Sequence, residues 1–292
     1  MAQATNFYPS QNVGLYVQKE TTVGAEPDES LIRLQATSFT IPEASVPLEF
    51  SSQRSGVSTT LATQGHHSEG TKLWTFDTAL RGTATSVLLA TEAVFEDGAS
   101  EAELNNTYVF PHAGYQDGST SSPSTFDVRF VNAGADSAIE TIECGGCVGT
   151  GFTLSEDIGS EGGELLCNIN WATAYYPEHS ATDITASATD SAAPKNIREL
   201  TSGSCLIGSG NEMVIQSWEL NVNRTIERIH YKDITSGTFK PFGYAMTGGM
   251  EVTGSMTVIR NDDVHDILAN FRNSATVDIN IAGTNLTIAM DK

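Results

Sequence analysis

The stretch from Thr247 to Phe271, TGGMEVTGSMTVIRNDDVHDILANF, contains the pattern that decides the fold class. Its first part alternates between apolar residues and small or polar residues with a period of two. Alternation of this kind predicts a strand with one buried face and one wet face. The expected buried side carries Met250, Val252, Met256 and Val258, and the expected wet side carries Glu251, Thr253, Ser255 and Thr257.

A short amphipathic helix is predicted directly after this strand. Asn261 or Asp262 offers an N-cap, and Asp262 and Asp263 place negative charge in the first helical turn. Apolar residues then follow at helical spacing, namely Val264, Ile267, Leu268 and Phe271. The sequence therefore predicts a strand–cap–helix unit in this stretch.

A similar unit is predicted much earlier in the chain. Residues 73–81 alternate, and Thr83 or Thr85 can cap a helix that reaches Phe95. The preceding segment 38–56, SFTIPEASVPLEFSSQRSG, also matches 219–237, ELNVNRTIERIHYKDITSG, in the order of its elements and in its final Ser-Gly. Identities are few, so we interpret the match as a weak internal repeat.

Further strands are predicted between these two units and around them. Gly145-Gly146 is interpreted as a turn between two of them, and residues 51–70, 99–124 and 236–245 are interpreted as loops. The additional expected strands cover residues 13–17, 31–41, 45–50, 126–131, 138–143, 147–154, 164–171, 212–223 and 225–231, with a closing hairpin from 275–281 and 285–290. The resulting division is an N-terminal arm (1–30), a first β-domain (31–171), a connector (172–204) and a second β-unit (205–292).

Composition restricts the function classes. The 292 residues, 39% of them hydrophobic, are enough for two ordinary domains or one large β-domain. No apolar run approaches the roughly 18 residues of a membrane span, and the first residues lack the basic and apolar regions of a signal peptide. We therefore expect neither a membrane span nor a signal peptide.

The chain is strongly acidic, with 36 Asp and Glu against 15 Lys and Arg and a net charge of -21. Such a chain is not expected to bind nucleic acid tightly, because neutralisation of phosphates supplies that affinity. The acidity fits a surface adapted to high salt, a surface that repels a polyanion, or an acidic soluble protein with no special adaptation.

Catalytic chemistry is not expected. The sequence contains no nucleophile elbow, HExxH motif or phosphate-binding glycine loop. Cys144 and Cys147 form a CxxC, but Cys167 and Cys205 lack the matching spacing, so buried thiols are favoured over a zinc site or a disulfide. His66-His67 and the acidic turn with Asp157, Glu161 and Glu164 are interpreted as solvated loops. We expect no catalytic, cofactor-binding or metal-binding residues.

Two segments resemble the tail tube proteins of long-tailed viruses of bacteria and archaea. Residues 143–171, ECGGCVGTGFTLSEDIGSEGGELLCNINW, resemble the family's Gly-Cys strand, alternating strand and Gly-rich turn, followed by the aromatic residues Tyr175-Tyr176-Pro177. Residues 217–263 resemble its strand–loop–strand, with the form G-x-hydrophobic-x-V-T-G-S-hydrophobic-T-V. The long loops and the extreme acidity depart from the family pattern, and the acidity fits a virus of a salt-loving host.

The resemblance implies a mainly β fold, an antiparallel β-sandwich or barrel with short flanking helices, duplicated within this chain. It implies a virion protein of the tail, assembled in the host cytoplasm, whose rings stack into the conduit for viral DNA. The implied partners are further copies of the chain, the tape-measure protein and DNA in the lumen, and the tail terminator and baseplate proteins. Three duplicated subunits would close a ring that otherwise holds six, so a trimer is favoured over a hexamer.

Two sets of residues follow as candidates. The wet sides of the alternating strands are expected to line a water-filled lumen that does not hold DNA tightly, and these residues are Glu219, Asn221, Glu251, Thr253, Ser255, Thr75 and Asp77. Arg81 is an exception on this side and is expected to face a carboxylate. The loops 51–70 and 236–245 are expected to reach adjacent subunits or rings, the second through Phe239, Pro241, Phe242 and Tyr244.

Two other classes stay open. One is a structural virion module that does not form a tube, such as a capsid decoration or tail-completion protein. The other is a carbohydrate-binding or hydrolytic β-sandwich, although Trp74, Trp171 and Trp218 fall at core-like strand positions instead of forming an aromatic platform.

Overall fold

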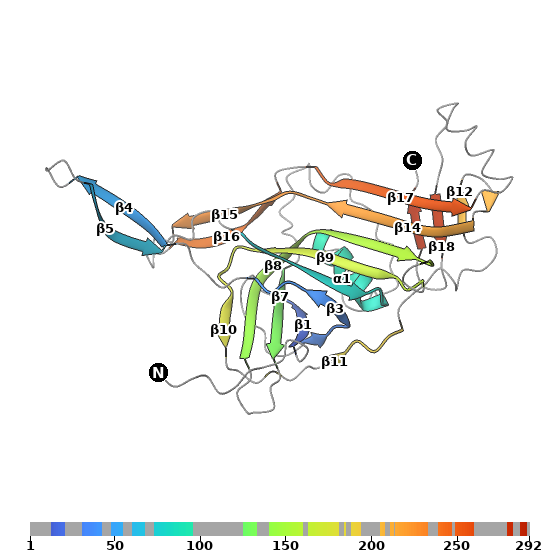
Figure 1. The fold of residues 1–292 in the computed structure, drawn as a ribbon, viewed down its shortest axis with the longest axis horizontal. Coiled ribbons are helices and arrows are strands. Elements are labelled where there is room, and N and C mark those ends of the chain that lie inside the picture. Colours follow the sequence, from blue (N-terminus) through green and yellow to red (C-terminus); the bar gives the residue numbers. More distant parts are fainter. Residues whose placement is uncertain are drawn as a thin grey trace.

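The computed structural model describes residues 13–20, 31–42, 48–54, 60–67, 73–95, 125–132, 140–159, 163–180, 184, 188–193, 205–207, 211–212, 214–232, 239–246, 249–259, 279–282 and 287–290. Within these ranges the protein is mainly β, with one helix (Figure 1). The elements are β1 (Val13–Lys19), β2 (Ile32–Arg33), β3 (Ala36–Phe39), β4 (Leu48–Arg54), β5 (Thr60–His67), β6 (Trp74–Arg81), α1 (Ala84–Val94), β7 (Phe126–Asn132), β8 (Glu140–Asp157), β9 (Leu166–Thr173), β10 (Glu178–Ser180), β11 (Ala188–Thr189), β12 (Cys205–Ile207), β13 (Asn211–Glu212), β14 (Val214–Asn223), β15 (Ile226–Lys232), β16 (Phe239–Met246), β17 (Glu251–Ile259), β18 (Ile279–Ala282) and β19 (Thr287–Met290).

One large mixed sheet of eleven described strands dominates the molecule. Its main path runs β11-β2-β1-β7-β8-β9-β6-β3, while β10 and β14 also pair with β8, and β17 pairs with β14. The pairings are antiparallel except the short contact between β11 and β2. The sheet is not closed into a barrel, because its described end strands β11 and β3 do not pair with each other.

Strand β8 holds the two parts of this sheet together. The residues near its start pair with β7 and β10, whereas the residues after Val148 pair with β9 and β14. Figure 1 shows β7 and the first part of β8 running across the direction of β9, β14 and β17. The prediction of two strands separated by a Gly145-Gly146 turn was therefore wrong, because the glycines lie within a single strand of 18 residues.

Gly146 explains how the strand passes through this point. Its φ of 60° lies in the left-handed region, which residues with a Cβ rarely adopt. A Cβ here would also lie 2.4 Å from the ring of Tyr175. The Gly146 amide donates to Glu20 Oε1 at 2.7 Å, and Thr173 Oγ1 donates to the Gly145 carbonyl at 2.6 Å. Side chains thus pair the backbone groups that the irregular strand geometry leaves available.

The hydrophobic core lies between the two parts of the sheet. Phe130 of β7 contacts Phe76 of β6 with ring centroids 5.5 Å apart, and Phe126 of β7 contacts Trp171 of β9 at 5.7 Å. These rings are almost fully buried, so they contribute much of the apolar area removed from water. Trp171 also donates from its indole nitrogen to Thr78 Oγ1 at 3.0 Å.

The predicted helix after residue 81 is confirmed as α1. Thr83 is its N-cap and forms a capping box with Ser86. Leu89, Ala90, Ala93 and Val94 are buried against the core, and the small Gly149 of β8 permits close contact with Ala93. The second predicted helix, near 262–271, lies outside the described residues.

Several strand boundaries differ from the prediction. Residues 31–41 form two short strands instead of one, because β2 pairs with β1 whereas β3 pairs with β6. Residues 51–70 and 236–245 were predicted as loops but contribute to the hairpins β4–β5 and β15–β16. The strand at 13–17 is confirmed as β1, the closing hairpin as β18–β19, and the alternating strands as β6 and β14.

The predicted repeat has a counterpart in the order of strands. In the first half β3 pairs with β6, and the β4–β5 hairpin lies between them in sequence. In the second half β14 pairs with β17, and the β15–β16 hairpin lies between them. Both hairpins extend to the same side of the molecule in Figure 1. Strand β14 also pairs with β8, so strands from both halves share one sheet.

Candidate functional site: a polar sheet face

The candidate site is the face of the main sheet that is opposite the core, formed by β17, β14, β8, β9 and β6. Residues paired across neighbouring strands lie on the same face of a sheet. Asn221 pairs with Thr253 of β17 and Thr153 of β8, which pairs with Asn168 of β9. Asn168 pairs in turn with Ala79 of β6. A row of small and polar residues therefore crosses five strands.

A second row runs parallel to the first. Asn223 pairs with Glu251 and with Gly151, which pairs with Asn170 of β9. Asn170 pairs with Asp77 of β6. The candidate residues from the two halves of the sequence therefore lie on one continuous face, which we call the polar face. Six of the seven candidates belong to it, namely Asp77, Glu219, Asn221, Glu251, Thr253 and Ser255. Thr75 lies on the same side of β6, but it pairs with Ala172, which is buried in a second hydrophobic cluster with Val148 and Ile226.

The period of two places apolar residues directly behind this face. Trp218, Leu220 and Val222 of β14 are buried, whereas Glu219 and Asn223 are exposed and Asn221 is half-buried. Strand β6 repeats the pattern, since Trp74 and Phe76 are buried and Thr75 and Asp77 are exposed. Burial of these apolar side chains fixes the register, because a shift by one residue would exchange the two faces.

Hydrogen bonds between side chains order the polar face. Thr153 Oγ1 donates to Asn221 Oδ1 at 2.6 Å, and Asn221 Nδ2 donates to Glu219 Oε1 at 2.5 Å. On β6, Asp77 Oδ1 accepts from Thr40 Oγ1 at 2.9 Å. The bonds of Asn221 to Glu219 and of Thr40 to Asp77 are exposed, and the bond of Thr153 to Asn221 is partly buried. The side chains therefore have a defined arrangement on a face that is wet at β14 and β6.

The sequence analysis missed the middle of this face. Thr153, Ser155, Asn168 and Asn170 lie between the strands of the two halves, but they were not chosen as candidates. Part of their signal was present, since Thr153 and Ser155 alternate with Phe152 and Leu154, and Asn168 and Asn170 alternate with Ile169 and Trp171. Only the pairing of β8 with both β9 and β14 shows that these positions connect the candidate residues.

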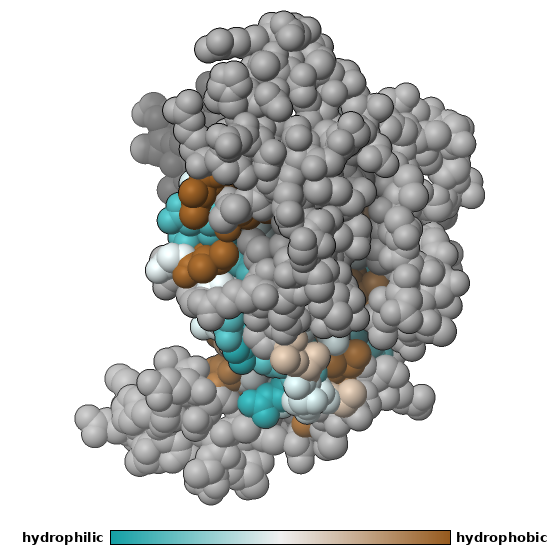
Figure 2. All heavy atoms as spheres, turned by 90° about the vertical axis from the view of Figure 1, so that its right-hand side faces the viewer, coloured by the Kyte–Doolittle hydropathy of each residue, from teal (hydrophilic) through white to brown (hydrophobic). Residues whose placement is uncertain are grey.

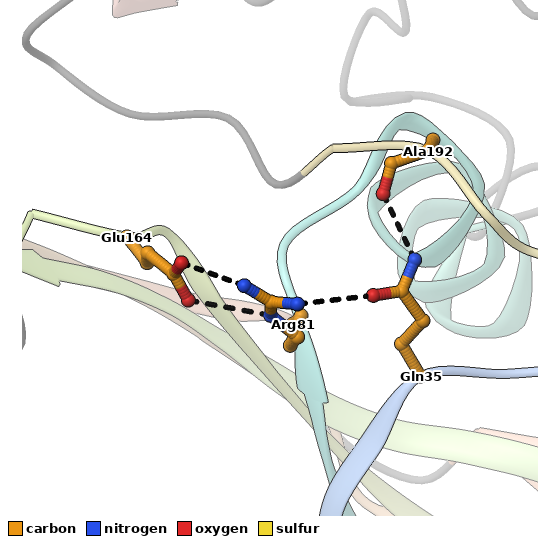
Figure 3. Close-up of polar contacts among 4 residues, drawn as sticks. All are labelled: Gln35, Arg81, Glu164 and Ala192. Atoms are coloured by element: carbon orange, nitrogen blue, oxygen red, sulfur yellow. Dashed lines mark hydrogen bonds and ion pairs between the residues drawn. The ribbon is translucent and has the colours of Figure 1, made fainter.

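Arg81 lies at one end of the polar face and faces a carboxylate, as expected. Arg81 Nη2 lies 2.6 Å from Glu164 Oε1, and Arg81 Nε donates to Glu164 Oε2 at 3.3 Å (Figure 3). Nη1 donates to Gln35 Oε1 at 3.4 Å. Asp77, Glu219 and Glu251 also lie on this face, so its described charges are mainly negative.

Strand β17 forms one edge of the face and is more exposed than predicted. In the described residues it pairs with β14 alone. Val252, expected on the buried side, is 43% exposed, whereas Met256 and Val258 are half-buried. Met256 and Val258 pack against the edge of the core, but Val252 does not, and among the described residues β17 has a neighbouring strand on one side alone. Figure 2 views the end of the molecule toward which β17 runs and shows hydrophobic surface beside hydrophilic residues.

The second candidate set lies on β16, and the structure describes the side chain of one member. Tyr244 is half-buried, accepts from the Ala174 amide at 3.0 Å and donates to the Gly146 carbonyl. Burial raises the pKa of its phenol well above the usual range. Tyr244 thus anchors the base of the β15–β16 hairpin within its own chain. Phe239, Pro241 and Phe242 belong to the same strand, but their side chains lie outside the described set.

The described cysteines are free, buried thiols. Cys144 and Cys147 lie on β8 and Cys167 on β9, and none is measurably exposed. Burial raises the pKa of Cys167 to about 12 and also raises the pKa values of Cys144 and Cys147 well above the usual range. Among the described residues no group of three potential ligands is arranged to hold a metal ion. His66 and His67 lie on strand β5, where a loop was predicted.

None of the helical residues that the structure describes forms a segment long and apolar enough to cross a bilayer. Comparison with known protein families and with curated protein sequences finds no match.

Proposed function

We propose that this chain is a tail tube subunit of a long-tailed virus, a structural protein whose rings stack into the conduit for viral DNA. The observation that carries the proposal is the continuous polar face, which joins candidate residues from both halves of the sequence. A conduit for a polyanion needs a wet wall with little positive charge, because phosphate contacts supply most nucleic-acid affinity.

The edges of the sheet support assembly. In the described residues β17 pairs with β14 alone and β3 pairs with β6 alone, so these strands form opposite edges of the polar face. Exposed edges invite pairing with another chain, and a head-to-tail interface that closes makes a ring. We propose that β17 of one subunit pairs with β3 of the next, which extends the polar face around a lumen. The exposed side chains of Val252 and Ile41, near the two edges, would be covered by this contact.

The repeated strand order supports a duplicated unit. Each half contributes two paired strands, one of which is an edge of the polar face, and a hairpin lies between them in sequence. These strands are β3 and β6 in the first half and β14 and β17 in the second. In this proposal the chain carries two tail-tube-like units of a β-sandwich type, and three chains close a ring with pseudo-sixfold symmetry. The two hairpins then act as arms toward neighbouring subunits or rings.

Electron microscopy of the purified protein tests the proposal. Stacked rings or tubes with a central channel are expected, at high salt if the acidic surface needs cations to assemble. If the protein stays as single subunits or compact trimers under all salt conditions and binds capsids instead, this result would identify it as a decoration protein.

A matched pair of variants connects tube formation to the β17 edge. Val252→Lys places a charge on the exposed edge strand, and Ala193→Lys places the same charge on an exposed residue after β11, outside both hairpins and both edges of the polar face. We expect the first to prevent ring formation and the second to permit it. Tubes that form equally well from both variants would contradict pairing through β17.

A further inference from the structure

We propose that Glu164 prevents Arg81 from binding phosphate, so that the basic residue of the polar face does not hold DNA. This inference rests on the proposed function, since it assumes that DNA passes along the polar face. Arg81 is the only Lys or Arg in the strands β3, β6, β8, β9, β14 and β17. A free guanidinium here would be repeated in every subunit of an assembled wall.

The geometry of the ion pair carries the inference. Glu164 contacts Arg81 through both carboxylate oxygens, Oε1 at 2.6 Å from Nη2 and Oε2 at 3.3 Å from Nε. Two adjacent N–H groups of one guanidinium form the fork that also binds phosphate in a bidentate manner. The carboxylate therefore occupies the positions that a phosphate would need.

A second contact restrains the guanidinium from the other side. Gln35 Oε1 accepts from Arg81 Nη1 at 3.4 Å, and the amide nitrogen of Gln35 donates to the Ala192 carbonyl at 2.8 Å (Figure 3). The same nitrogen donates to the Asp190 carbonyl at 3.1 Å. Residues 190–192 thus orient the amide, which in turn holds Arg81 beside Glu164.

The proposed role of Glu164 depends on the solvent exposure of the Arg81–Glu164 ion pair. The side chains of Arg81 and Glu164 are 37% and 43% exposed, so water and dissolved anions can reach the pair. An ion pair this exposed contributes little to folding stability. Its consequence is local: Arg81 adds no net attraction for phosphate to a face that also carries Asp77, Glu219 and Glu251.

Titration of free subunits with inorganic phosphate, followed by NMR of the Arg81 Nε–H group, tests the inference. The Arg81 resonance is identified by its loss in Arg81→Gln. In Glu164→Gln the side chain keeps its size but loses its charge, and we expect a saturable phosphate-dependent shift that is several-fold larger than in the unmodified protein. Glu164→Ala, which removes the competing side chain completely, should give the same result.

Glu227→Gln is the matched control, because it removes one negative charge from an exposed position on β15. We expect the phosphate-dependent shift of Arg81 in this variant to be no larger than in the unmodified protein. An equal shift in the unmodified protein and in Glu164→Gln, or no shift in either Glu164 variant, would overturn the inference.

The free-subunit titration does not depend on tube formation, so its outcome is separate from that of the proposed function. Where tubes form, co-sedimentation with a short DNA duplex at low salt adds a second readout. Glu164→Gln tubes should retain several-fold more duplex than unmodified tubes, and Arg81→Gln/Glu164→Gln tubes should not.

Discussion

At the scale of single residues, Gly146 and Tyr244 show how one irregular point in a strand is stabilised. Gly146 has a φ of 60°, and its carbonyl accepts from the Tyr244 hydroxyl. The same hydroxyl accepts from the Ala174 amide at 3.0 Å. The long strand β8 therefore changes partners where Glu20, just after β1, and side chains of β9 and β16 supply hydrogen bonds.

Gly146→Ala should destabilise the fold by about 1–3 kcal/mol, because the positive φ is strained for alanine. The new Cβ would also meet the Tyr175 ring. Gly249→Ala is the control, since a Cβ there meets nothing within 4 Å. Urea denaturation measures the free energy of unfolding, and equal values for the two variants would contradict the role given to Gly146.

Tyr244→Phe should lower the free energy of unfolding by about 1–3 kcal/mol, because the Gly146 carbonyl loses its donor and the Ala174 amide its acceptor. Tyr16→Phe serves as the control, since its half-buried hydroxyl makes no hydrogen bond to the described residues. Chemical denaturation compares the two variants. A loss of similar size in both would show that the hydroxyl bonds of Tyr244 are not specific.

Buried thiols should make stability fall at alkaline pH. Burial raises the pKa of Cys167 to about 12, whereas an unfolded thiol titrates at about 8.5. The folded state therefore keeps its proton where the unfolded state loses it, and stability declines as pH rises from about 8.5 toward 12. Thermal unfolding at several pH values measures this slope. Cys167→Ala should have a shallower slope, and an unchanged slope would exclude this thiol as the cause.

At the scale of elements, alternating strands have different environments according to their place in the sheet. Strands β14 and β17 have equally clear alternation, but β14 lies between two strands and buries Trp218 and Leu220, whereas β17 lies at an edge. An edge strand contacts fewer core residues, so its apolar side stays partly open. The same property makes β17 suitable for pairing with another subunit.

The β15–β16 hairpin provides a prediction at this scale. Replacing both Phe239 and Phe242 by Ala should leave a folded subunit that does not polymerise, because apolar side chains are the usual anchors of interfaces. Tyr244 is kept in this variant, since its contacts hold the base of the hairpin to the sheet. Circular dichroism checks the fold and electron microscopy checks assembly. Normal tubes from the double variant would contradict the role of the hairpin as an arm.

At the scale of the whole molecule, the two halves of the sequence are joined in one sheet. Strand β8 of the first half pairs with β14 of the second, and α1 packs against β8. In the proposed ring, each subunit contributes the strand pairs β3–β6 and β14–β17, so three subunits supply six such pairs. Mass measurement of isolated rings should give three copies, and end-on images should show threefold symmetry with six similar units. Six copies per ring would contradict the trimer.

Local pattern by itself determined much of the mainly β character, the helix at 84–94 and the inward and outward sides of β6 and β14. These features depend on side-chain periodicity and on capping between residues close in sequence, as the Thr83–Ser86 capping box shows.

Tertiary structure alone decided which strands are neighbours. Pairing between distant segments depends on packing across the whole core, which local patterns do not encode. This strand pairing placed Asn221, Thr153 and Asn168 in one row. It also divided residues 31–41 into β2 and β3, and it continued β8 through Gly145-Gly146. Glycine in a predicted turn and glycine at a strand irregularity look alike in sequence, because both need the freedom of a residue without a Cβ.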